Sequence, residues 1–484
     1  MLNDDWKPSE ASSIPLYKQI AQFIKEKISS GEWTIGTKLP TQREFAEILE
    51  VNRSTVITAL EDLKAEGLIE GKNSGGTVVV NNTWSLLNNS RTPKWEGYIE
   101  RGIYKPNLST IQMINKLEFK NGIIRLGTGE VSPSLYPKQA MKKILQKVSN
   151  NIESMGYEQP KGSIKLRGAI SEYVKKFGIK TSPEAVLIVS GSLQALQLLS
   201  MGILPKASTI ITEKPSYLKS LHIFESEGMK LKGIGMDEHG INVNELRNSI
   251  NKSTKLLYTI PTFHNPTGIL QTEERRDEVL NLCREKRLPI IEDDAYRELW
   301  LEEKPPMPLK SKAKDGMVLY IGTVSKCLAA GIRIGWIVGP EAVIDRLADI
   351  KMQADYGSSS LSQAVLSEFI ESGLYEKYIE RLRNNLVVRR NITIEILEKY
   401  FKHIAQWNVP KGGFYIWLKL EKHISIDLLF KMCCEEGILI NPGSIYDFSK
   451  NSNIRISYSY ADIKELESAL KRLSEIVIEI TART

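Results

Sequence analysis

The chain has 484 residues, which is too long for one ordinary hydrophobic core and predicts two or three domains. Hydrophobic residues make up 42% and charged residues 25%, as in soluble globular proteins, and no apolar run reaches the roughly 18 residues that span a bilayer. The four cysteines form no CxxC pair and the five histidines are scattered, so the sequence indicates neither a disulfide framework nor a metal site. The N-terminal segment MLNDDWKPSE lacks the apolar stretch of a signal peptide, and we expect a cytoplasmic protein.

The net charge of +7 is unevenly distributed along the chain. Residues 1–80 hold nine Lys and Arg against twelve Asp and Glu, a net charge of −3. Net charge therefore gives no argument for nucleic-acid binding by this segment, and any such argument must rest on local pattern.

Residues 13–80 contain three helical patterns, and a short turn joins the last two. An apolar stripe in IPLYKQIAQFIKEKISSGEW predicts a first helix that ends near Gly31. Thr41 and Glu44 then form a capping-box pattern, which predicts a short helix through Leu49. After the turn EVN, Asn52 is a favourable N-cap for another helix, whose apolar face is Val56, Ala59, Leu60 and Leu63 and which ends at Gly67.

Two helices around a turn of this length fit a helix-turn-helix motif. Arg53, Ser54 and Thr55 open the second helix and point away from its apolar face, as a recognition helix requires. The following LIEGKNSGGTVVV predicts a strand, a Gly-rich turn and a strand, which is the hairpin called a wing. The candidate DNA-binding residues are Arg43, Arg53, Ser54, Thr55, Lys72 and Gly75. A small helical packing module without a DNA role fits the same pattern.

The segment LPTQREFAEILEVNRSTVITALEDLKAEGLI resembles the winged helix of the GntR family of bacterial regulators over about thirty residues. The departures, Thr41, Phe45 and Asn52, are minor. The resemblance implies that residues 13–80 bind double-stranded promoter or operator DNA. Residues 81–93 are rich in Asn, Ser and Thr and predict a linker, and we assign residues 94–484 to the next domain.

Apolar strand patterns alternate with helical ones in the second domain: EAVLIVS, STIITE, KLKGIGM, KLLYTI, LPIIED and VLYIGTVS. This alternation predicts an α/β domain with a mostly parallel sheet, in which ligands bind at the carboxyl ends of the strands. At the first of these ends, Gly191 allows close backbone approach, and Ser192 and Leu193 present N–H groups at a helix N-terminus, as an anion or phosphate site requires. Many ordinary strand-to-helix turns share these residue types.

Further polar residues follow the later strands. Tyr217 is placed to stack on a flat ring, although such a tyrosine more often packs in the core. Asn265 lies in a Pro-Gly turn. This turn either aims the Asn265 side chain into the site or is an ordinary turn without a binding role. Asp293 follows a buried strand, where it needs a cation or donors, and Tyr296 lies one turn further on.

Lys326 follows the strand VLYIGTVS, and with Thr323, Ser325 and Arg333 it forms a second set of anion-binding groups. A free lysine amine at such a site is able to attack a carbonyl. An aldehyde that carries a phosphate, a flat ring and a basic ring nitrogen satisfies all these groups together. Pyridoxal 5'-phosphate (PLP) has these features, and its usual partners are a Schiff-base lysine and an acid at the ring nitrogen.

The motifs YEQPKGSIKLRGAI, SGSLQAL, PSY, NPTG, DDAY and SKCLAAGIRIGW resemble those of fold-type I, class I/II aminotransferases, in order, over nearly all of residues 121–482. By that resemblance Lys326 carries PLP as an aldimine, Asp293 holds the pyridine nitrogen, and Arg455, in NIRISYS, grips a substrate carboxylate. By the same resemblance, Asn265 and Tyr296 contact the ring hydroxyl, and Tyr217 stacks on the ring. The phosphate is held by Ser192, Leu193, Thr323, Ser325 and Arg333. Tyr157 reaches the phosphate of the partner subunit's site. Leu193, Gln194 and Ala330 depart from the common pattern without removing a chemical group.

A GntR-type winged helix followed by a PLP-dependent transferase fold resembles the MocR subfamily of bacterial transcription regulators over essentially the whole chain. The resemblance implies a head-to-tail homodimer that senses an amino acid or related amine. A working aminotransferase with an attached DNA-binding domain is the alternative, because Lys326, Asp293 and Arg455 serve a catalyst as well as a sensor. A third interpretation, in which PLP is itself the signal, is disfavoured by Arg455.

Overall fold

The computed structural model describes residues 6–72, 76–80, 98–99, 102, 104, 106–151 and 154–483, with the backbone alone for Lys72 and Arg483. The chain divides into two compact units, Met1–Lys105 and Pro106–Thr484, and each is described separately below. The predicted linker at residues 81–93 lies outside the described residues. In the part of the chain that is described, no helix has the length and apolar character needed to cross a membrane.

Within residues 6–80, the described part of the first unit contains three helices and a hairpin. Its elements are α1 (Leu16–Ser29), α2 (Gln42–Leu49), α3 (Arg53–Ala65), β1 (Ile69–Lys72) and β2 (Gly76–Val79). β1 and β2 are antiparallel, and Lys72 is the register partner of Gly76. Ile20, Ile24, Phe45, Leu49, Val56, Leu60 and Leu63 fill the core. The predicted winged helix-turn-helix fold is therefore confirmed.

The N-terminal caps of α2 and α3 differ. At α2, the Thr41 hydroxyl accepts a hydrogen bond from the backbone N–H of Glu44 (3.2 Å), and the Glu44 carboxylate accepts one from the N–H of Thr41 (2.7 Å). These bonds hold the pKa of Glu44 below its ordinary value. α3 begins at Arg53 as predicted, but the side chain of Asn52 makes no capping hydrogen bond, so Asn52 occupies the N-cap position without using its amide.

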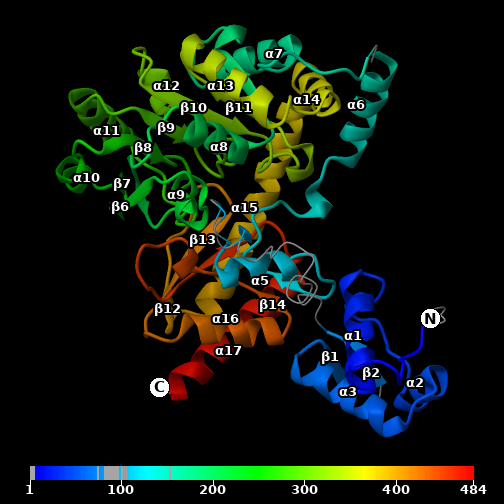
Figure 1. Cartoon of the computed structure of the whole chain (residues 1–484). Coiled ribbons are helices and arrows are strands. Elements are labelled where there is room, and N and C mark those ends of the chain that lie inside the picture. Colours follow the sequence, from blue (N-terminus) through cyan, green and yellow to red (C-terminus); the bar gives the residue numbers. More distant parts are fainter. Residues whose placement is uncertain are drawn as a thin grey trace. The chain divides into compact units, whose positions relative to one another are not determined.

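The second unit is built around an eight-stranded sheet (Figure 1). In spatial order the strands are β4 (Val186–Val189), β11 (Gly335–Val338), β10 (Val318–Thr323), β9 (Ile290–Asp293), β8 (Thr254–Thr259), β5 (Thr209–Lys214), β6 (Lys230–Asp237) and β7 (Gly240–Ile241). The six strands predicted from the alternating pattern all belong to this sheet, and they run parallel to one another. β11 is antiparallel to both β4 and β10, and β7 is antiparallel to β6.

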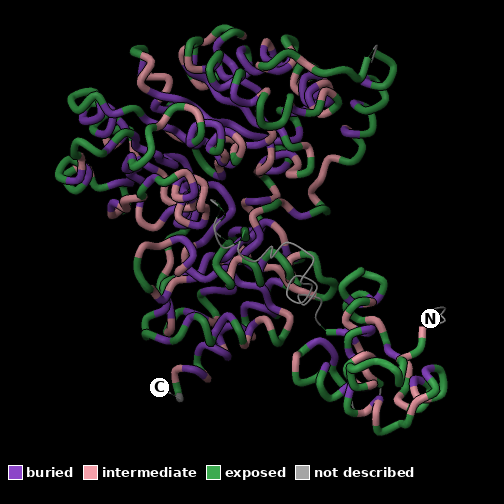
Figure 2. The backbone as a smooth tube through the Cα atoms, viewed as in Figure 1, coloured by how far each residue is buried: buried purple, intermediate pink, exposed green. Residues whose placement is uncertain are grey.

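Helices cover both faces of this sheet, and its strands are largely buried except β6, which is mostly half-buried (Figure 2). The helices of the unit are α5 (Ser109–Leu117), α6 (Lys138–Asn151), α7 (Ile164–Lys175), α8 (Ser192–Gly202), α9 (Ile223–Ser226), α10 (Val243–Ser249), α11 (Glu273–Lys286), α12 (Leu309–Lys312), α13 (Glu341–Ala354), α14 (Ser360–Glu371), α15 (Leu374–Tyr400), α16 (Ile426–Glu435) and α17 (Ile463–Arg483). Leu187 of β4 packs in one cluster with Leu199 of α8, whereas Ile188 packs in another with Ile170 of α7. Neighbouring residues of a strand point to opposite faces, so a continuous apolar run satisfies both layers.

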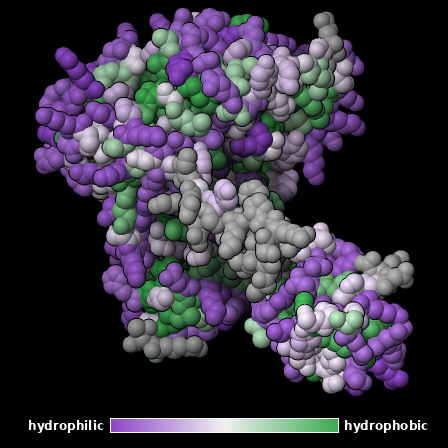
Figure 3. Space-filling model, viewed as in Figure 1, coloured by the Kyte–Doolittle hydropathy of each residue, from purple (hydrophilic) through white to green (hydrophobic). Residues whose placement is uncertain are grey.

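Two smaller sheets complete the second unit. β12 (Ala405–Gln406), β13 (Tyr415–Leu420), β16 (Asn453–Ser457) and β15 (Asn441–Pro442) form an antiparallel sheet, and β14 (Ile438–Leu439) pairs with β3 (Ile124–Arg125). The long helix α15 runs from the region of the large sheet to the region of β12 and β13 (Figure 1). Hydrophilic residues cover much of the face visible in Figure 3, as expected for a unit whose strands are internal.

Candidate cofactor site and DNA-binding surface

The predicted cofactor residues lie where the parallel strands end. Asp293 is the last residue of β9, Thr323 is the last residue of β10, and Gly191 lies between β4 and α8. Asn265 follows β8, and Tyr217 follows β5 in the short 3-10 helix Tyr217–Ser220. The carboxyl ends of parallel strands share one edge of the sheet, so residues as far apart in sequence as Gly191 and Thr323 line one region.

Lys326 is half-buried, and its amine donates a hydrogen bond to the carbonyl oxygen of Gly129 (2.8 Å). A Cβ atom at Gly129 would lie 3.2 Å from this amine and 2.8 Å from the hydroxyl of Tyr415. Glycine at this position therefore leaves the space in which both polar atoms meet. The amine has no carboxylate partner in the part of the chain that is described, which leaves it available as a nucleophile.

Asp293 is buried, with one of its two carboxyl oxygens satisfied. Oδ2 accepts a hydrogen bond from the hydroxyl of Tyr258 (2.8 Å), whereas Oδ1 has no partner within the described residues. Burial raises the pKa of Asp293 to about 6, and the bond from Tyr258 opposes that shift. A buried acceptor without a donor costs free energy, so this carboxyl fits a ligand that brings an N–H group, such as a protonated ring nitrogen.

Arg455 lies in β16, is buried, and connects to the residues predicted at the ring hydroxyl. Its Nη1 donates to Oδ1 of Asn265 (2.8 Å), and its Nη2 donates to the carbonyl of Gly127 (2.6 Å). The amide of Asn265 in turn donates to the hydroxyl of Tyr296 (3.3 Å). Within the described residues no carboxylate pairs with Arg455, and its Nε has no hydrogen-bond partner.

Two tyrosine rings flank the guanidinium of Arg455. Its central carbon lies 4.0 Å from the ring centre of Tyr415 and 4.8 Å from that of Tyr446. Aromatic rings stabilise a cation without neutralising it. The site therefore holds a buried positive charge that still lacks an anion.

The predicted phosphate-binding residues form a second polar group. Arg333 donates a hydrogen bond to the carbonyl of Ser190 (2.9 Å) and lies 3.4 Å from the hydroxyl of Ser325. The backbone N–H of Ser325 donates to Oγ1 of Thr323 (3.1 Å). Gly191 has a positive φ of 89°, and a Cβ atom there would lie 2.4 Å from Nη2 of Arg333, so only glycine fits. Ser192 and Leu193 are the first residues of α8, where N–H groups have no carbonyl one turn back and suit an anion.

The two remaining tyrosines differ in burial. Tyr217 is partly buried, its backbone N–H donates to the carbonyl of Asn265 (3.1 Å), and burial raises the pKa of its phenol. Tyr157 is 84% exposed, and its ring contacts that of Tyr356 edge-on at 4.8 Å. The predicted reach of Tyr157 into a partner subunit's site stays a prediction.

Sequence reasoning missed Tyr258, Gly129, Tyr415 and Tyr446 in this region. Tyr258 lies inside β8, where its residue type signals only a buried strand. The segment KGGFYIW around Tyr415 carries two glycines before an aromatic strand, which was a usable signal of close packing. Gly129 and Tyr446 lie in segments without a distinctive local pattern.

The predicted DNA-binding residues that the structure describes lie on or near α2 and α3 of the first unit. Arg53 and Ser54 are exposed and Thr55 is half-buried. Nη2 of Arg53 donates to Gln42 (3.3 Å), and the exposed side chain of Arg43 pairs with Glu47 (3.1 Å). The side chain of Lys72 and all of Gly75 lie outside the described residues.

The fold and the site define an aminotransferase-type domain that follows a winged helix. Two family models match accordingly: "Aminotransferase class I and II" over residues 121–473 and "Bacterial regulatory proteins, gntR family" over residues 16–79. Among solved structures, a kynurenine aminotransferase from Pyrococcus horikoshii is similar at 29% identity and a TM-score of 0.74, covering 79% of this chain and 98% of that one.

Relatives extend over both units. The chain is 51% identical to an uncharacterized HTH-type transcriptional regulator, YdfD of Bacillus subtilis, over 97% of this chain and 98% of that protein. It is 38% identical to the HTH-type transcriptional regulator NorG of Staphylococcus aureus, over 92% of this chain and 100% of that protein. The chain therefore belongs to the family of transcription regulators in which a GntR-type domain precedes an aminotransferase class I/II domain, as the MocR resemblance predicted.

Proposed function

We propose that this protein is a PLP-dependent transcription regulator whose winged helix binds promoter DNA and whose large unit senses an amino acid or a related amine. The observation that carries the proposal is the buried Asp293, whose Oδ1 has no donor among the described residues, at the same sheet edge as the amine of Lys326. A similar solved structure supports it, since the P. horikoshii kynurenine aminotransferase was crystallised in complex with PMP.

The residues present fit PLP. Lys326 would hold its aldehyde carbon, Oδ1 of Asp293 would accept the ring N–H, and Asn265 and Tyr296 would contact the ring hydroxyl. Tyr217 would stack on the ring. The phosphate would bind Gly191, Ser192, Leu193, Thr323, Ser325 and Arg333. When bound, PLP supplies an aldehyde carbon that holds one amine at a time.

The amine of Lys326 and the amine of an effector therefore compete for one position. Arg455 would grip the effector carboxylate through paired N–H donors. Its charge is buried, lies between two aromatic rings and lacks an anion, so an α-carboxylate supplies what the site is missing. This argues for an amino acid rather than a simple amine.

Effector binding would reach DNA through a change in the balance between conformations of the large unit. A ligand shifts such a balance only by the difference between its affinities for the two forms. In a head-to-tail homodimer, with Tyr157 reaching the partner subunit's phosphate site, the shift would alter the spacing of two DNA half-sites through residues 81–93. This coupling would be contradicted if effector binding left both DNA affinity and DNA bending unchanged.

The first experiment mixes PLP-loaded protein with a panel of amino acids and follows the cofactor absorption spectrum. A stable spectral change with one compound, accompanied by altered binding to a promoter fragment, supports the sensor. Conversion of PLP to pyridoxamine phosphate with release of a keto acid supports a working aminotransferase instead. That second candidate stays open because Lys326, Asp293 and Arg455 are all present, and they serve a catalyst as well as a sensor. A spectrum that no compound changes leaves PLP itself as the signal.

A further inference from the structure

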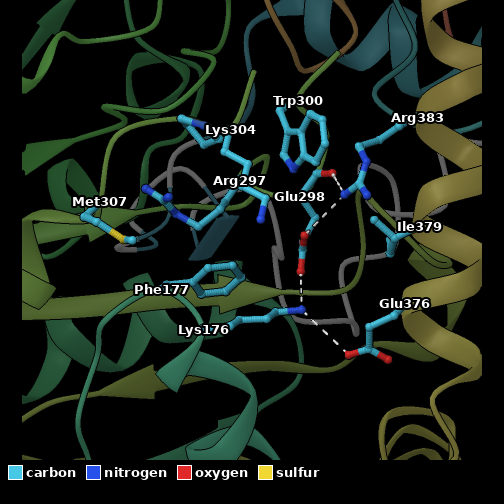
Figure 4. A pocket seen from close by; sticks show the side chains of 11 residues that line it. Lys176, Phe177, Arg297, Glu298, Trp300, Lys304, Met307, Glu376, Ile379 and Arg383 are labelled. Atoms are coloured by element: carbon cyan, nitrogen blue, oxygen red, sulfur yellow. Dashed lines mark hydrogen bonds and ion pairs between the residues drawn. The ribbon is translucent and has the colours of Figure 1, made fainter. Parts of the chain in front are cut away.

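A separate cavity of about 220 Å³ lies in the large unit, between the end of α7, the segment after β9 and the first half of α15 (Figure 4). None of the residues predicted to hold the cofactor lines it. In Figure 4, Glu376, Ile379 and Arg383 of α15 face Lys176 and Phe177 across the cavity. The family function of this chain assigns no role to this space.

The cavity has more positive than negative groups. Four of its lining residues are cations (Lys176, Arg297, Lys304 and Arg383) and two are acids (Glu298 and Glu376). Lys176 is paired with Glu298 at 2.7 Å, and Arg297 is paired with Asp294 behind the cavity wall. Those two cations are therefore already compensated.

The charges of Arg383 and Lys304 are less fully compensated than those of Lys176 and Arg297. The guanidinium of Arg383 is held over the ring of Trp300, 3.9 Å from the ring centre, and its only hydrogen bond to the described residues is a 3.4 Å contact with the carbonyl of Glu298. Its ion pair with the Glu298 carboxylate is long, at 3.7 Å. Lys304 makes no hydrogen bond or ion pair in the described part of the chain. A stacked arginine with unused N–H donors is a preorganised grip for a carboxylate.

The rest of the lining is apolar or aromatic: Phe177, Trp300, Pro305, Met307 and Ile379. The volume is below the range of about 300–1,000 Å³ that is usual for drug-sized ligands, so the occupant is small. We propose that this cavity binds a small carboxylic acid with an aromatic or apolar body, with the carboxylate on Arg383 and Lys304. Binding at this site stands independently of the proposed PLP function.

A chain of buried contacts leads from this cavity to Lys326. The Glu298 carboxylate accepts a hydrogen bond from the hydroxyl of Tyr173 (2.6 Å). The ring of Tyr173 contacts that of Tyr375 (5.7 Å between centres), whose hydroxyl lies 3.0 Å from Sγ of Cys327. Cys327 directly follows Lys326 in sequence. A carboxylate on Arg383 competes with Glu298, so it changes the first link of this chain and, through it, the surroundings of Lys326. This coupling rests on the proposed function.

The test is a titration of the full-length protein with benzoate, with and without PLP, in which calorimetry or ligand-observed NMR measures binding. We expect saturable benzoate binding that Arg455→Gln retains at least in part, and that benzamide, which is uncharged, does not reproduce. Arg383→Gln should weaken benzoate binding about tenfold or more, since it removes a charged hydrogen-bond partner. Lys304 is exposed, so Lys304→Gln should fold normally, and it should weaken benzoate binding several-fold. Arg381→Gln, an exposed arginine on the same helix that does not line the cavity, is the matched control and should bind as the unaltered protein does.

The outcomes separate the site from the coupling. No saturable binding, or binding that both Arg383→Gln and Lys304→Gln leave unchanged, overturns the site. Benzoate that changes the PLP spectrum of the unaltered protein but not that of Arg383→Gln supports the coupling to Lys326. Benzoate that binds the PLP-loaded protein without changing the spectrum overturns the coupling and leaves the site. Binding to protein that retains no PLP supports the site even where the proposed PLP function fails.

Discussion

The winged helix and the cofactor site present their functional groups in opposite ways. Arg53 and Ser54 are exposed at the start of α3, and Arg53 donates a hydrogen bond to the side chain of Gln42 at 3.3 Å. Asp293 and Arg455 are buried, and each has one polar atom that no described residue contacts by a hydrogen bond. A surface that meets DNA obtains its partners from outside and tolerates mobile side chains. A site that holds a small molecule needs its groups placed in advance, and the surrounding fold must stabilise their burial.

The strongest way to separate the two regions is Lys326→Ala. We expect complete loss of covalent PLP attachment, because no other amine of the chain is predicted to take its place. Intact mass after borohydride reduction measures the attached cofactor. Affinity for DNA in the absence of effector should stay measurable, since the winged helix has its own core. A cofactor adduct of full yield in the variant would contradict the assignment.

The converse test is Arg53→Ala. We expect DNA affinity to fall about ten- to a hundredfold, the range for loss of one phosphate or base contact. The PLP spectrum should not change. Fluorescence anisotropy with a promoter fragment measures the affinity. Lys18→Ala removes the same charge from an exposed position on α1 and serves as the control. Equal losses in both variants would show that general charge, rather than the recognition helix, determines binding.

Asp293 makes the cofactor site dependent on pH. Burial raises the pKa of its free carboxyl to about 6, and a ring N–H donor favours the ionised form. The pKa in the complex is then below that of the free site, so PLP affinity should rise with pH up to about 6 and fall about tenfold per unit below it. Equilibrium titrations of PLP between pH 5 and 8 measure this. Asp293→Asn should bind more weakly and lose this step, and a step that persists in the variant would point to another group.

The smallest expected effect is on the stability of the DNA-binding unit, where substitutions at its two helix caps are compared. Thr41→Ala removes a hydrogen bond that the structure shows, and should lower the free energy of unfolding of this unit by about 1 kcal/mol. Asn52→Ala removes a side chain that makes no capping bond, and should cost less than about 0.5 kcal/mol. Urea unfolding followed by circular dichroism ranks them. The reverse order would mean that Asn52 caps α3 in solution.

Much of the architecture was predictable because its signals are local. The capping box at Thr41, the apolar face of α3 and the six parallel strands each follow from residues close together in sequence. The strand-end residues Asp293 and Thr323 were predictable for the same reason, since each directly ends an apolar run. The position of β11 was not predictable, because its insertion between β10 and β4 depends on pairing with β4, which lies far away in sequence.

The sequence by itself determined the two modules, their order and the chemical types at the cofactor site, because periodicity, caps and motif order are properties of neighbouring residues. Only the tertiary structure decided that Tyr258 bonds to Asp293, that Tyr415 and Tyr446 flank Arg455, and that Gly129 receives the amine of Lys326. It also placed Arg383 over Trp300, 83 positions away in sequence, at the second cavity. These contacts join distant segments, and packing rather than local propensity brings such segments together.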